Sequence, residues 1–566
     1  MKWGLSVRIC VMNKLNIALT VFLSLQLLYA CSPNNKVNNE FDSLVDENTT
    51  RLEYEEMGLS KYDLPIKISF VRETSAQLDE LIRSLPGQTL NDNTWSQLYE
   101  EILGIQIQYD WTAKGDLYAQ KFSVDLSSGN IPDVVRVDAE QLRLLSNAGY
   151  IQDLTKVFDT YATPLTKEIL NQEGSGPFEA ATIDRKLMGI PETDSSIETA
   201  QVLWIRTDWL EKLNLEPPQT MDELIAISKA FTEQDPDQNG ENDTFGLAAT
   251  QYLWDPVMGV TSFMAGYDAF PMMWIHDNSG KLTYGGIQPE VKSALLSLQN
   301  MYRNGYLDSE FAMKNGIKVK EQVAKGKIGM LYGEQWGAFF VQVSREHDSN
   351  ADWRAFPLVS VSGEAPKIPL KFNTTHFIAV KKGVEHPEAI IKMFNLHLEK
   401  NWGETAEYEK YYSSPYPVWQ LSPITPYPAR KNMEAFQQLK EARITGDYSK
   451  LNEEAKAIQK NIVTYLSGSG NIEIGWGWER TYGKQGAMAI IDRYEKNNQL
   501  LYESFVGTPT ETMIEKQSIL NEIQLQVYMD IILGRPIEEF DRFVEQWKKL
   551  GGDQITEEVN QWFSEQ

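Results

Sequence analysis

Cysteine is almost absent from this sequence. Its two cysteines, Cys10 and Cys31, both lie near the N-terminus of a 566-residue chain. If processing removes the chain before Cys31, the folded part contains no disulfide and no thiol nucleophile. Histidine is also scarce, with five residues and none at metal-ligand spacing. These absences exclude a small disulfide-stapled module and disfavour thiol or imidazole chemistry.

Basic residues are clearly outnumbered by acidic ones. The chain has 53 Lys and Arg against 79 Asp and Glu, which gives a formal net charge of -26. Neutralising phosphates requires clustered Lys and Arg, so this balance predicts that nucleic acid is not a partner. The length allows two or three domains with a large core. An acidic, well-solvated protein suits secretion and can still bind a neutral sugar or a cation.

Motifs of several common enzyme classes are missing. The sequence lacks G-x-S-x-G, H-E-x-x-H and G-x-x-x-x-G-K-[ST]. A glycosidase, however, needs only two carboxylates about 5 to 10 Å apart, which a chain this rich in acidic residues can supply. We expect a protein that is not an enzyme. A secreted glycoside-active enzyme, or a ligand sensor for a membrane kinase, stays open as an alternative.

An apolar stretch near the N-terminus predicts export. From Met12 the chain reads M-N-K-L-N-I-A-L-T-V-F-L-S-L-Q-L-L-Y-A-C, a basic start followed by an apolar run and a small residue before Cys31. L-Y-A-C resembles a bacterial lipobox, which implies cleavage before Cys31 and diacylation of its thiol. We therefore expect a lipoprotein signal peptide over 1–30 and a lipid anchor on the extracellular face of the cell membrane. Translation starting at Met1 or Met12, and an ordinary signal peptide or short membrane anchor, stay open.

The segment after Cys31 lacks periodicity. The run S-P-N-N-K-V-N-N-E-F-D-S-L-V-D-E-N-T-T is polar and acidic. It predicts a flexible tether over 31–61, which would hold a folded protein away from the membrane.

Residues 235–246, D-P-D-Q-N-G-E-N-D-T-F-G, have the spacing of a calcium loop. Oxygen side chains fall at positions one, three, five and nine, with Gly at six for the sharp turn. The predicted ligands are Asp235, Asp237, Asn239, Glu241 through its carbonyl oxygen, and Asp243. The twelfth position is Gly246 instead of a bidentate Glu, so the shell is incomplete. We expect a structural Ca²⁺ between the helix from Met221 and a short strand, and the alternative is an ion-free Asp/Asn turn.

Strands and helices alternate after the tether. Strands are predicted from Pro65, Ile105 and Ile131, with helical patterns between and after them over 76–83, 94–103 and 118–126. This order predicts an α/β fold with a mostly parallel sheet and a ligand crevice beyond the carboxyl ends of its strands.

Five groups of motifs give this order a specific resemblance. They are S-G-N-I-P-D-V-V-R-V with N-A-G-Y-I-Q-D-L, L-M-G-I-P with L-W-I-R-T-D-W-L-E-K-L-N-L-E-P-P-Q-T-M-D-E-L, A-K-G-K-I-G-M-L-Y-G-E-Q-W, H-P-E-A-I-I-K-M-F-N, and the C-terminal D-R-F-V-E-Q-W-K-K-L-G-G-D-Q-I-T-E-E-V-N-Q-W-F. In this sequence order they resemble the extracellular solute-binding proteins of ABC transporters, family 1, and in particular a large Firmicute-type lipoprotein subset. The resemblance covers nearly everything from Pro65 to Phe563. The calcium-type loop also recurs in relatives that bind oligosaccharides.

The resemblance implies a two-lobed, periplasmic-binding-protein-like fold of type II. Its two lobes close on a ligand cleft and are joined by crossing strands. Crossings are expected near 192–201, 372–377 and 503–512. The implied boundaries are 62–195 plus 376–505 for lobe 1 and 196–375 plus 506–566 for lobe 2, each within about 15 residues. The implied function is capture of a carbohydrate for an ABC transporter permease by a monomeric protein.

Aromatic residues beside carboxylates mark candidate ligand contacts. Of the fifteen tryptophans, Trp3 alone precedes Cys31. Sugar rings stack on aromatic faces while polar side chains bind the hydroxyls. On this basis the predicted contacts are Trp336, Glu334, Trp254, Trp274, Trp476 and Trp478, with Asn373 and His376 at an expected crossing. For each tryptophan, packing in the core is the alternative. The sequence leaves open which sugar binds, and whether the ligand is a sugar.

Overall fold

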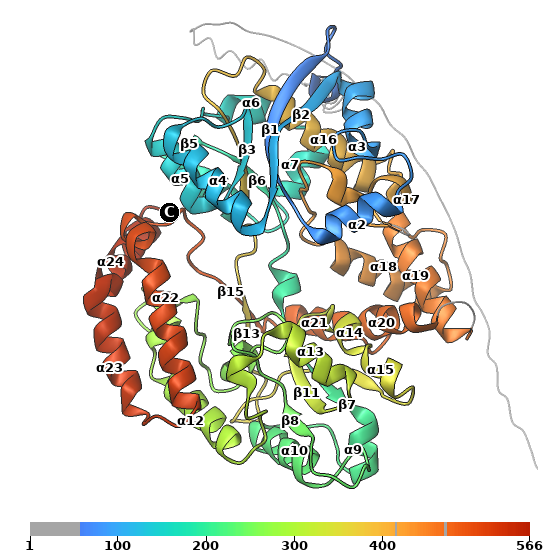
Figure 1. The fold of residues 1–566 in the computed structure, drawn as a ribbon, viewed down its shortest axis with the longest axis vertical. Helices are drawn as coiled ribbons and strands as arrows, with labels where there is room; N and C mark the ends of the chain where they lie inside the picture. The colour runs from blue at the N-terminus through green and yellow to red at the C-terminus, as the bar shows by residue number, and fades with distance from the viewer. Residues whose placement is uncertain (1–56, 414–415, 469–471) are drawn as a thin grey trace, which may run out of the picture. The chain divides into compact units, whose positions relative to one another are not determined.

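The computed structural model describes residues 57–413, 416–468 and 472–566 (Figure 1). The predicted signal peptide, Cys31 and most of the predicted tether lie outside the described residues. Within the described residues, no helix is long and apolar enough to cross a membrane.

The first hydrophobic core forms around two small sheets. β1 (Ile66–Thr74) pairs in parallel with β2 (Ile105–Lys114), and the second sheet has the order β3 (Val134–Val137), β14 (His376–Val380), β6 (Ile190–Glu192). Ser69 and Asp133 link the two sheets, because each backbone N–H donates to the other side chain at 2.9 Å. Trp95 is fully buried in this core and stacks on His397 with ring centroids 4.4 Å apart.

The predicted helices of this region are present. They are α2 (Ala76–Ser84), α3 (Thr94–Leu98) continuing into a π-helical turn over Tyr99–Leu103, and α4 (Gly115–Ser128). α2 begins where Ser75 accepts a hydrogen bond from the backbone N–H of Leu78, which satisfies a free N–H of the first turn. The mostly parallel sheet was wrong, since β14 runs antiparallel to both β3 and β6. β14 comes from far along the chain, so the local βαβ order gives no sign of it.

The second core forms around one four-stranded sheet. Its order is β12 (Trp353–Phe356), β7 (Val202–Arg206), β11 (Ile328–Gly333), β8 (Phe245–Leu247), with β7 antiparallel to both of its neighbours. All five residues of β7 are buried, as expected for a central strand covered on both faces. Helices that contribute to this core include α9 (Thr207–Leu213), α10 (Met221–Glu233), α12 (Glu290–Arg303), α22 (Glu511–Ile532), α23 (Glu538–Trp547) and α24 (Asp553–Ser564) (Figure 1).

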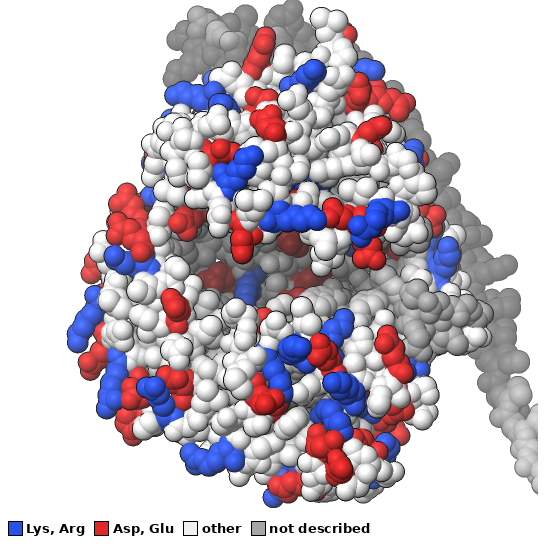
Figure 2. Space-filling model, in the orientation of Figure 1, with Lys and Arg blue, Asp and Glu red and all other residues white. Residues whose placement is uncertain are grey.

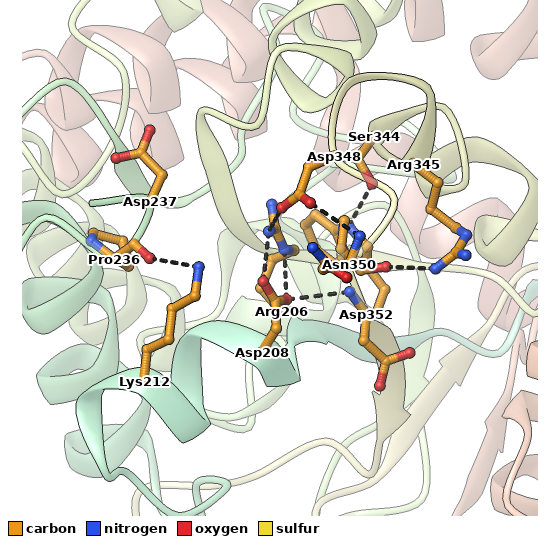
Figure 3. A network of polar contacts seen from close by, with 12 residues as sticks. Arg206, Asp208, Lys212, Pro236, Asp237, Ser344, Arg345, Asp348, Asn350 and Asp352 are labelled. Carbon is orange, nitrogen blue, oxygen red and sulfur yellow. Dashed lines mark hydrogen bonds and ion pairs between the residues drawn. The ribbon is translucent and has the colours of Figure 1, made fainter. Parts of the chain in front are cut away.

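A buried arginine closes the end of β7 (Figure 3). The Arg206 side chain is 2% exposed and donates to both carboxylate oxygens of Asp208, at 2.8 and 2.7 Å. Asp208 also accepts the backbone N–H of Asp352 at the start of β12. A bidentate pair of this kind satisfies the buried charge and fixes the turn from strand to helix.

The chain passes between the two cores at three places. At each place, the buried residues before and after a short segment belong to different cores. These segments lie between Ile190 and Ile197, between Leu370 and Phe377, and between Ile424 and Met433. The first two changes fall where crossings are expected. The third differs from the expected 503–512, because the buried residues on both sides of that segment belong to the second core.

Residues 433–494 account for this difference. α18 (Lys431–Thr445), α19 (Glu453–Leu466) and α21 (Ala487–Lys496) bury Met433, Ile458 and Ile491 in the second core, whereas the predicted boundaries place them in lobe 1. The lobe boundaries stay a prediction, and the cores favour moving this segment to lobe 2.

Candidate ligand-binding cleft

A cavity of about 1160 Å³ opens at the edge of the first core. It lies where β1 and β3 end and where the antiparallel β14 begins, the edge at which ligands of open α/β sheets are expected. Aromatic and cationic side chains on its wall include Tyr109, Tyr118, Trp419, Arg72, Arg136 and His376. The volume is sufficient for a ligand larger than a single small metabolite.

The cations of this wall already have partners. Arg72 donates to Tyr109 Oη and to the carbonyl oxygens of Leu421 and Ser422, so its guanidinium fixes the neighbouring loop. Arg136 Nε donates to Glu192 Oε2 at 2.5 Å. Loss of solvation, and next Arg136, lower the pKa of His376, so this imidazole is neutral near pH 7.

Glu334 and Trp336 follow β11 on the wall of the second core. Trp336 Nε1 donates to Glu334 Oε2 at 2.7 Å, which orients both side chains. The Trp336 residue is 37% exposed, so part of its ring is available to a ligand. Burial raises the pKa of Glu334 to about 7, even though the Trp336 hydrogen bond and the nearby Lys371 oppose this rise.

Two further carboxyl groups lie on the first crossing. Asp194 Oδ1 accepts the backbone N–H of Ser195 at 2.7 Å. Glu198 accepts from Asn432 Nδ2 at 2.8 Å, and burial raises its pKa to about 7. Asp194 contributes to the raised pKa of both Glu198 and Glu334, so these three groups share one electrostatic environment.

A second cavity of about 410 Å³ brings the two cores together. Glu140, at the start of α5 (Ala139–Asn147) in the first core, lines it together with Lys371, Phe372 and Glu503. Glu503 accepts the backbone N–H groups of Trp274 and Phe505 through Oε1, and burial raises its pKa to about 8. Figure 2 shows the hollow between the two groups of elements, with charged side chains of both signs inside it.

The predicted ligand contacts have different surroundings. Trp254 is half-buried and lines a small cavity with Glu334 and Lys371. Trp274 is 6% exposed but borders the 410 Å³ cavity. His376 borders the larger cavity. Asn373 forms a hydrogen bond at the crossing, where its Nδ2 donates to the Ser195 carbonyl oxygen at 3.1 Å.

The two tryptophans of α20 (Ile472–Tyr482) belong to packing. Trp476 has no exposed surface and lies in the second core, so its ring is not available to a ligand, in contrast to the prediction. Trp478 packs edge-on against Phe339 with ring centroids 5.2 Å apart and stacks on Tyr482. Their helical spacing of two residues places them on different sides of the helix, and neither side is the cleft wall formed by the cavities above.

Sequence reasoning missed several cleft residues. Arg136, Asp194, Glu198, Lys371, Trp419 and Glu503 border the cavities or the crossing but were not predicted. Asp194 and Glu198 lie in P-E-T-D-S-S-I-E-T, which was recognised as a crossing, so acidic residues within crossings were the available signal. Glu503 begins the crossing expected at 503–512, so the same signal applied to it, whereas nothing local distinguishes Trp419.

The calcium-type loop has an unexpected cation beside it. Lys327 donates to Asp243 Oδ2 and, at 3.4 Å, to Asp237 Oδ2, while Asn239 Nδ2 bonds the same two carboxylates. Asp237 Oδ1 is buried without a hydrogen-bond partner within the described residues. In Figure 3 the Asp237 carboxylate points away from Lys212, whose ammonium donates to the Pro236 carbonyl oxygen instead.

The oxygen atoms of this loop are of the type that a hard cation prefers, but they are not arranged as a complete metal site. Across the described part of the chain, no three His, Cys, Asp or Glu side chains are grouped to hold a metal ion. Three carboxylates and an amide oxygen are nevertheless the ligand types that Ca²⁺ takes, and Asp237 Oδ1 is a buried acceptor that lacks a donor or cation among the described residues.

Comparison with known proteins gives the family context. The profile of the family described as bacterial extracellular solute-binding protein matches residues 85–400. The polygalacturonan/rhamnogalacturonan-binding protein YtcQ of Bacillus subtilis (strain 168) is 24% identical over 82% of this chain and 87% of its own length. Lipoprotein LipO of the same organism is 24% identical with the same coverage of 82% and 87%.

A solved structure shows the same fold. It is the S. pneumoniae substrate-binding protein FusA, as an EF-hand mutant in complex with fructo-nystose, with a TM-score of 0.56 and 17% identity. It covers 88% of this chain and 100% of the FusA chain. At this identity the likeness shows the fold alone, and it confirms the predicted α/β solute-binding architecture.

The raised pKa of Glu503 predicts a pH-dependent stability. Between about pH 4.5 and about pH 8, the folded protein holds a proton that the unfolded chain has released, so the free energy of unfolding falls as pH rises. Glu503→Gln should make this fall smaller in urea unfolding followed at pH 5 and pH 8. Glu545→Gln, at a side chain that is 74% exposed, should leave the fall unchanged. An equal fall in wild type and Glu503→Gln would contradict the assignment.

Proposed function

Because the chain belongs to the family of bacterial extracellular solute-binding proteins, we propose that it captures an oligosaccharide and presents it to the permease of an ABC transporter. The observation that supports this most is the cleft itself. Tyr118 and Trp419 line the 1160 Å³ cavity at the edge of the first core, and on the second core the partly exposed Trp336 is hydrogen-bonded to the carboxyl group of Glu334. Aromatic faces with convergent polar groups are what a sugar requires.

The two cores provide the closing motion. They are joined by three short connections, so rotation about these segments can narrow the cleft while each core stays packed. A ligand that touches both walls binds the closed state better and shifts the population toward it. Relatives in the family are named as binding proteins, which supports capture without covalent chemistry.

Trp336 tests the site. Losing one buried aromatic anchor costs about 2 kcal/mol or more, roughly thirtyfold in affinity. Trp336→Ala should therefore weaken binding of the tightest ligand found in a thermal-shift panel of fructo-, malto- and galacto-oligosaccharides. Its melting temperature without ligand should stay close to wild type, because the ring is partly exposed.

The matched control is Tyr448→Ala, which removes an aromatic residue that is 39% exposed beyond α18. It should bind like wild type. Chromatography of the sugars recovered after incubation with the protein should show that their chain lengths are unchanged. Normal binding by Trp336→Ala would remove Trp336 from the site, and shortened sugars would instead support the glycoside-active alternative.

We further propose that Cys31 carries the lipid anchor. The L-Y-A-C sequence supports this, as does the name of the relative LipO. The anchor would hold the protein on the extracellular face of the membrane, where the permease is reached. Cys31→Ser should release the protein into the medium and abolish its partitioning into a detergent phase. Partitioning that survives the substitution would contradict acylation at Cys31.

We also propose that Ca²⁺ binds the loop as a structural ion. Asp235, Asp237, Asn239, the Glu241 carbonyl and Asp243 would hold it, and Lys327 would compete for the carboxylates. Chelation should lower the melting temperature without abolishing sugar affinity in folded protein. Lys327→Met should tighten Ca²⁺ binding, and Lys325→Met, two residues earlier, should not. Metal analysis that finds no calcium in either protein would contradict the proposal.

A further inference from the structure

A small cavity in the second core is lined by three buried polar atoms that lack partners. These atoms are Gln201 Oε1, Thr261 Oγ1 and Ser262 Oγ, and none of them has a hydrogen-bond partner among the described residues. The three residues are 7%, 7% and 1% exposed. The cavity, called the Gln201 pocket below, has a volume of about 30 Å³. Its lining also includes Trp254, Glu334 and Lys371.

The grouping of these atoms sets the pocket apart from ordinary packing. Ser228 Oγ in the second core and His397 Nδ1 beside the first also lack partners, yet neither residue lines the Gln201 pocket or either of the two larger cavities. A buried hydroxyl or amide oxygen without a partner is unfavourable, because it has lost its water and gained nothing in return. Three such atoms around one space therefore indicate a polar occupant.

The pocket lies where two connections between the cores meet the second core. Gln201 directly precedes β7, after the first connection, and Lys371 lies at the start of the second. Thr199 Oγ1 accepts the backbone N–H of Lys371 at 3.2 Å, which joins the two segments. Lys371 also lines the 410 Å³ cavity to which both cores contribute. The pocket thus adjoins the space into which a ligand would close.

The polar groups of the pocket are held in place by the backbone around them. Gln201 Nε2 donates to the Pro256 carbonyl oxygen at 3.1 Å, and the same oxygen accepts the backbone N–H of Glu334 at 3.2 Å. Because the amide nitrogen of Gln201 is engaged there, its Oε1 remains as a fixed acceptor. Thr261 and Ser262 are the first two residues of α11 (Thr261–Ala265), so their hydroxyls come from one short helix.

The chemistry of these groups selects a hydroxyl. An amide oxygen only accepts hydrogen bonds, whereas the Thr261 and Ser262 hydroxyls both donate and accept. A carboxylate has no hydrogen to donate to Gln201 Oε1, and a methyl group would leave all three atoms unpaired. A volume of about 30 Å³ has room for about two water molecules, or for a hydroxyl with the carbon that carries it, but not for a sugar ring.

We propose that the Gln201 pocket receives one unsubstituted hydroxyl or hydroxymethyl group of a bound saccharide, which bonds to Gln201, Thr261 and Ser262. This rests on the oligosaccharide function proposed above and deepens it. Glu334 links the two parts of the site, since it lines the pocket and its Oε2 accepts Trp336 Nε1 at 2.7 Å. The pocket would reject a sugar that carries a further sugar or an acyl group at this position, because neither fits the volume.

Substitutions that remove one hydroxyl each test the pocket. Ser262→Ala and Thr261→Val should each weaken binding by about three- to tenfold, the value of one hydrogen bond. The measurement is calorimetric titration at pH 7 with kestose, maltotriose and galactotriose, comparing the sugar that wild type binds most tightly. The melting temperature without sugar should not fall, because each substitution removes a buried hydroxyl that has no partner in the described residues.

The matched control is Ser228→Ala. Ser228 is fully buried in α10, and its hydroxyl also lacks a partner among the described residues, but it does not line the pocket. This variant should bind the same sugar with wild-type affinity. If Thr261→Val does not fold, Ser262→Ala and its control decide the question.

An ordered water is the other source of the same chemistry, and the two readouts separate it from a ligand hydroxyl. A permanent structural water predicts a lower melting temperature in Ser262→Ala and Thr261→Val with unchanged affinity, which would overturn the inference. Unchanged affinity and unchanged melting temperature would overturn it as well. In both cases sugar capture by wild type would still support the proposed function. Binding of none of the three sugars by wild type would contradict that function and the inference with it.

Discussion

Hydrogen bonds among the three connections between the cores are the constraint on which the rest of the structure depends. The Tyr427 N–H donates to the Thr193 carbonyl oxygen and Thr193 Oγ1 donates to the Tyr427 carbonyl oxygen, both at 2.9 Å. Asn373, from the remaining connection, donates its N–H to Ser196 Oγ at 3.2 Å. The crossings therefore meet at one place, between two cores that are each packed independently. Any rotation of one core against the other would therefore centre on these three hydrogen-bonded connections.

The first of these connections carries Asp194 and Glu198, and its position between the cores accounts for the raised pKa values of these carboxyl groups. Backbone at a junction between two cores is poorly solvated yet reachable, so acids placed there keep access to a ligand while losing water. Asp194 and Glu198 have raised pKa values for this reason, and Asp194 also contributes to the raised pKa of Glu334, which directly follows β11 of the second core. In the proposed function, hinge and binding surface would be built from the same residues, and closure would be coupled to the groups that a sugar contacts.

Much of the local structure could be predicted from the sequence, and the long-range pairing could not. The helix predicted from Met221 is present as α10, and Thr220 Oγ1 caps it by accepting the N–H of Glu223. Apolar alternation likewise predicted β2. The antiparallel insertion of β14 and the crossing at 425–432 depend on contacts between segments hundreds of residues apart, and neither leaves a local pattern. Trp476 shows the same limit, because a Trp flanked by glycines resembles a binding loop until packing places it in a core.

The sequence predicted the types of residue in the candidate site better than it predicted the individual residues. Glu334 and Trp336 were predicted as an aromatic residue beside a carboxylate, and the structure joins the two side chains by a hydrogen bond. Lys327 beside the Asp loop was not, since it approaches from the start of β11, far from residues 235–246 in sequence.

The most direct test of this account is small-angle X-ray scattering of the protein with and without its tightest neutral oligosaccharide. Capture between two cores that rotate about one hinge predicts a smaller radius of gyration at saturating sugar. Tight binding with an unchanged radius would contradict closure of the cleft.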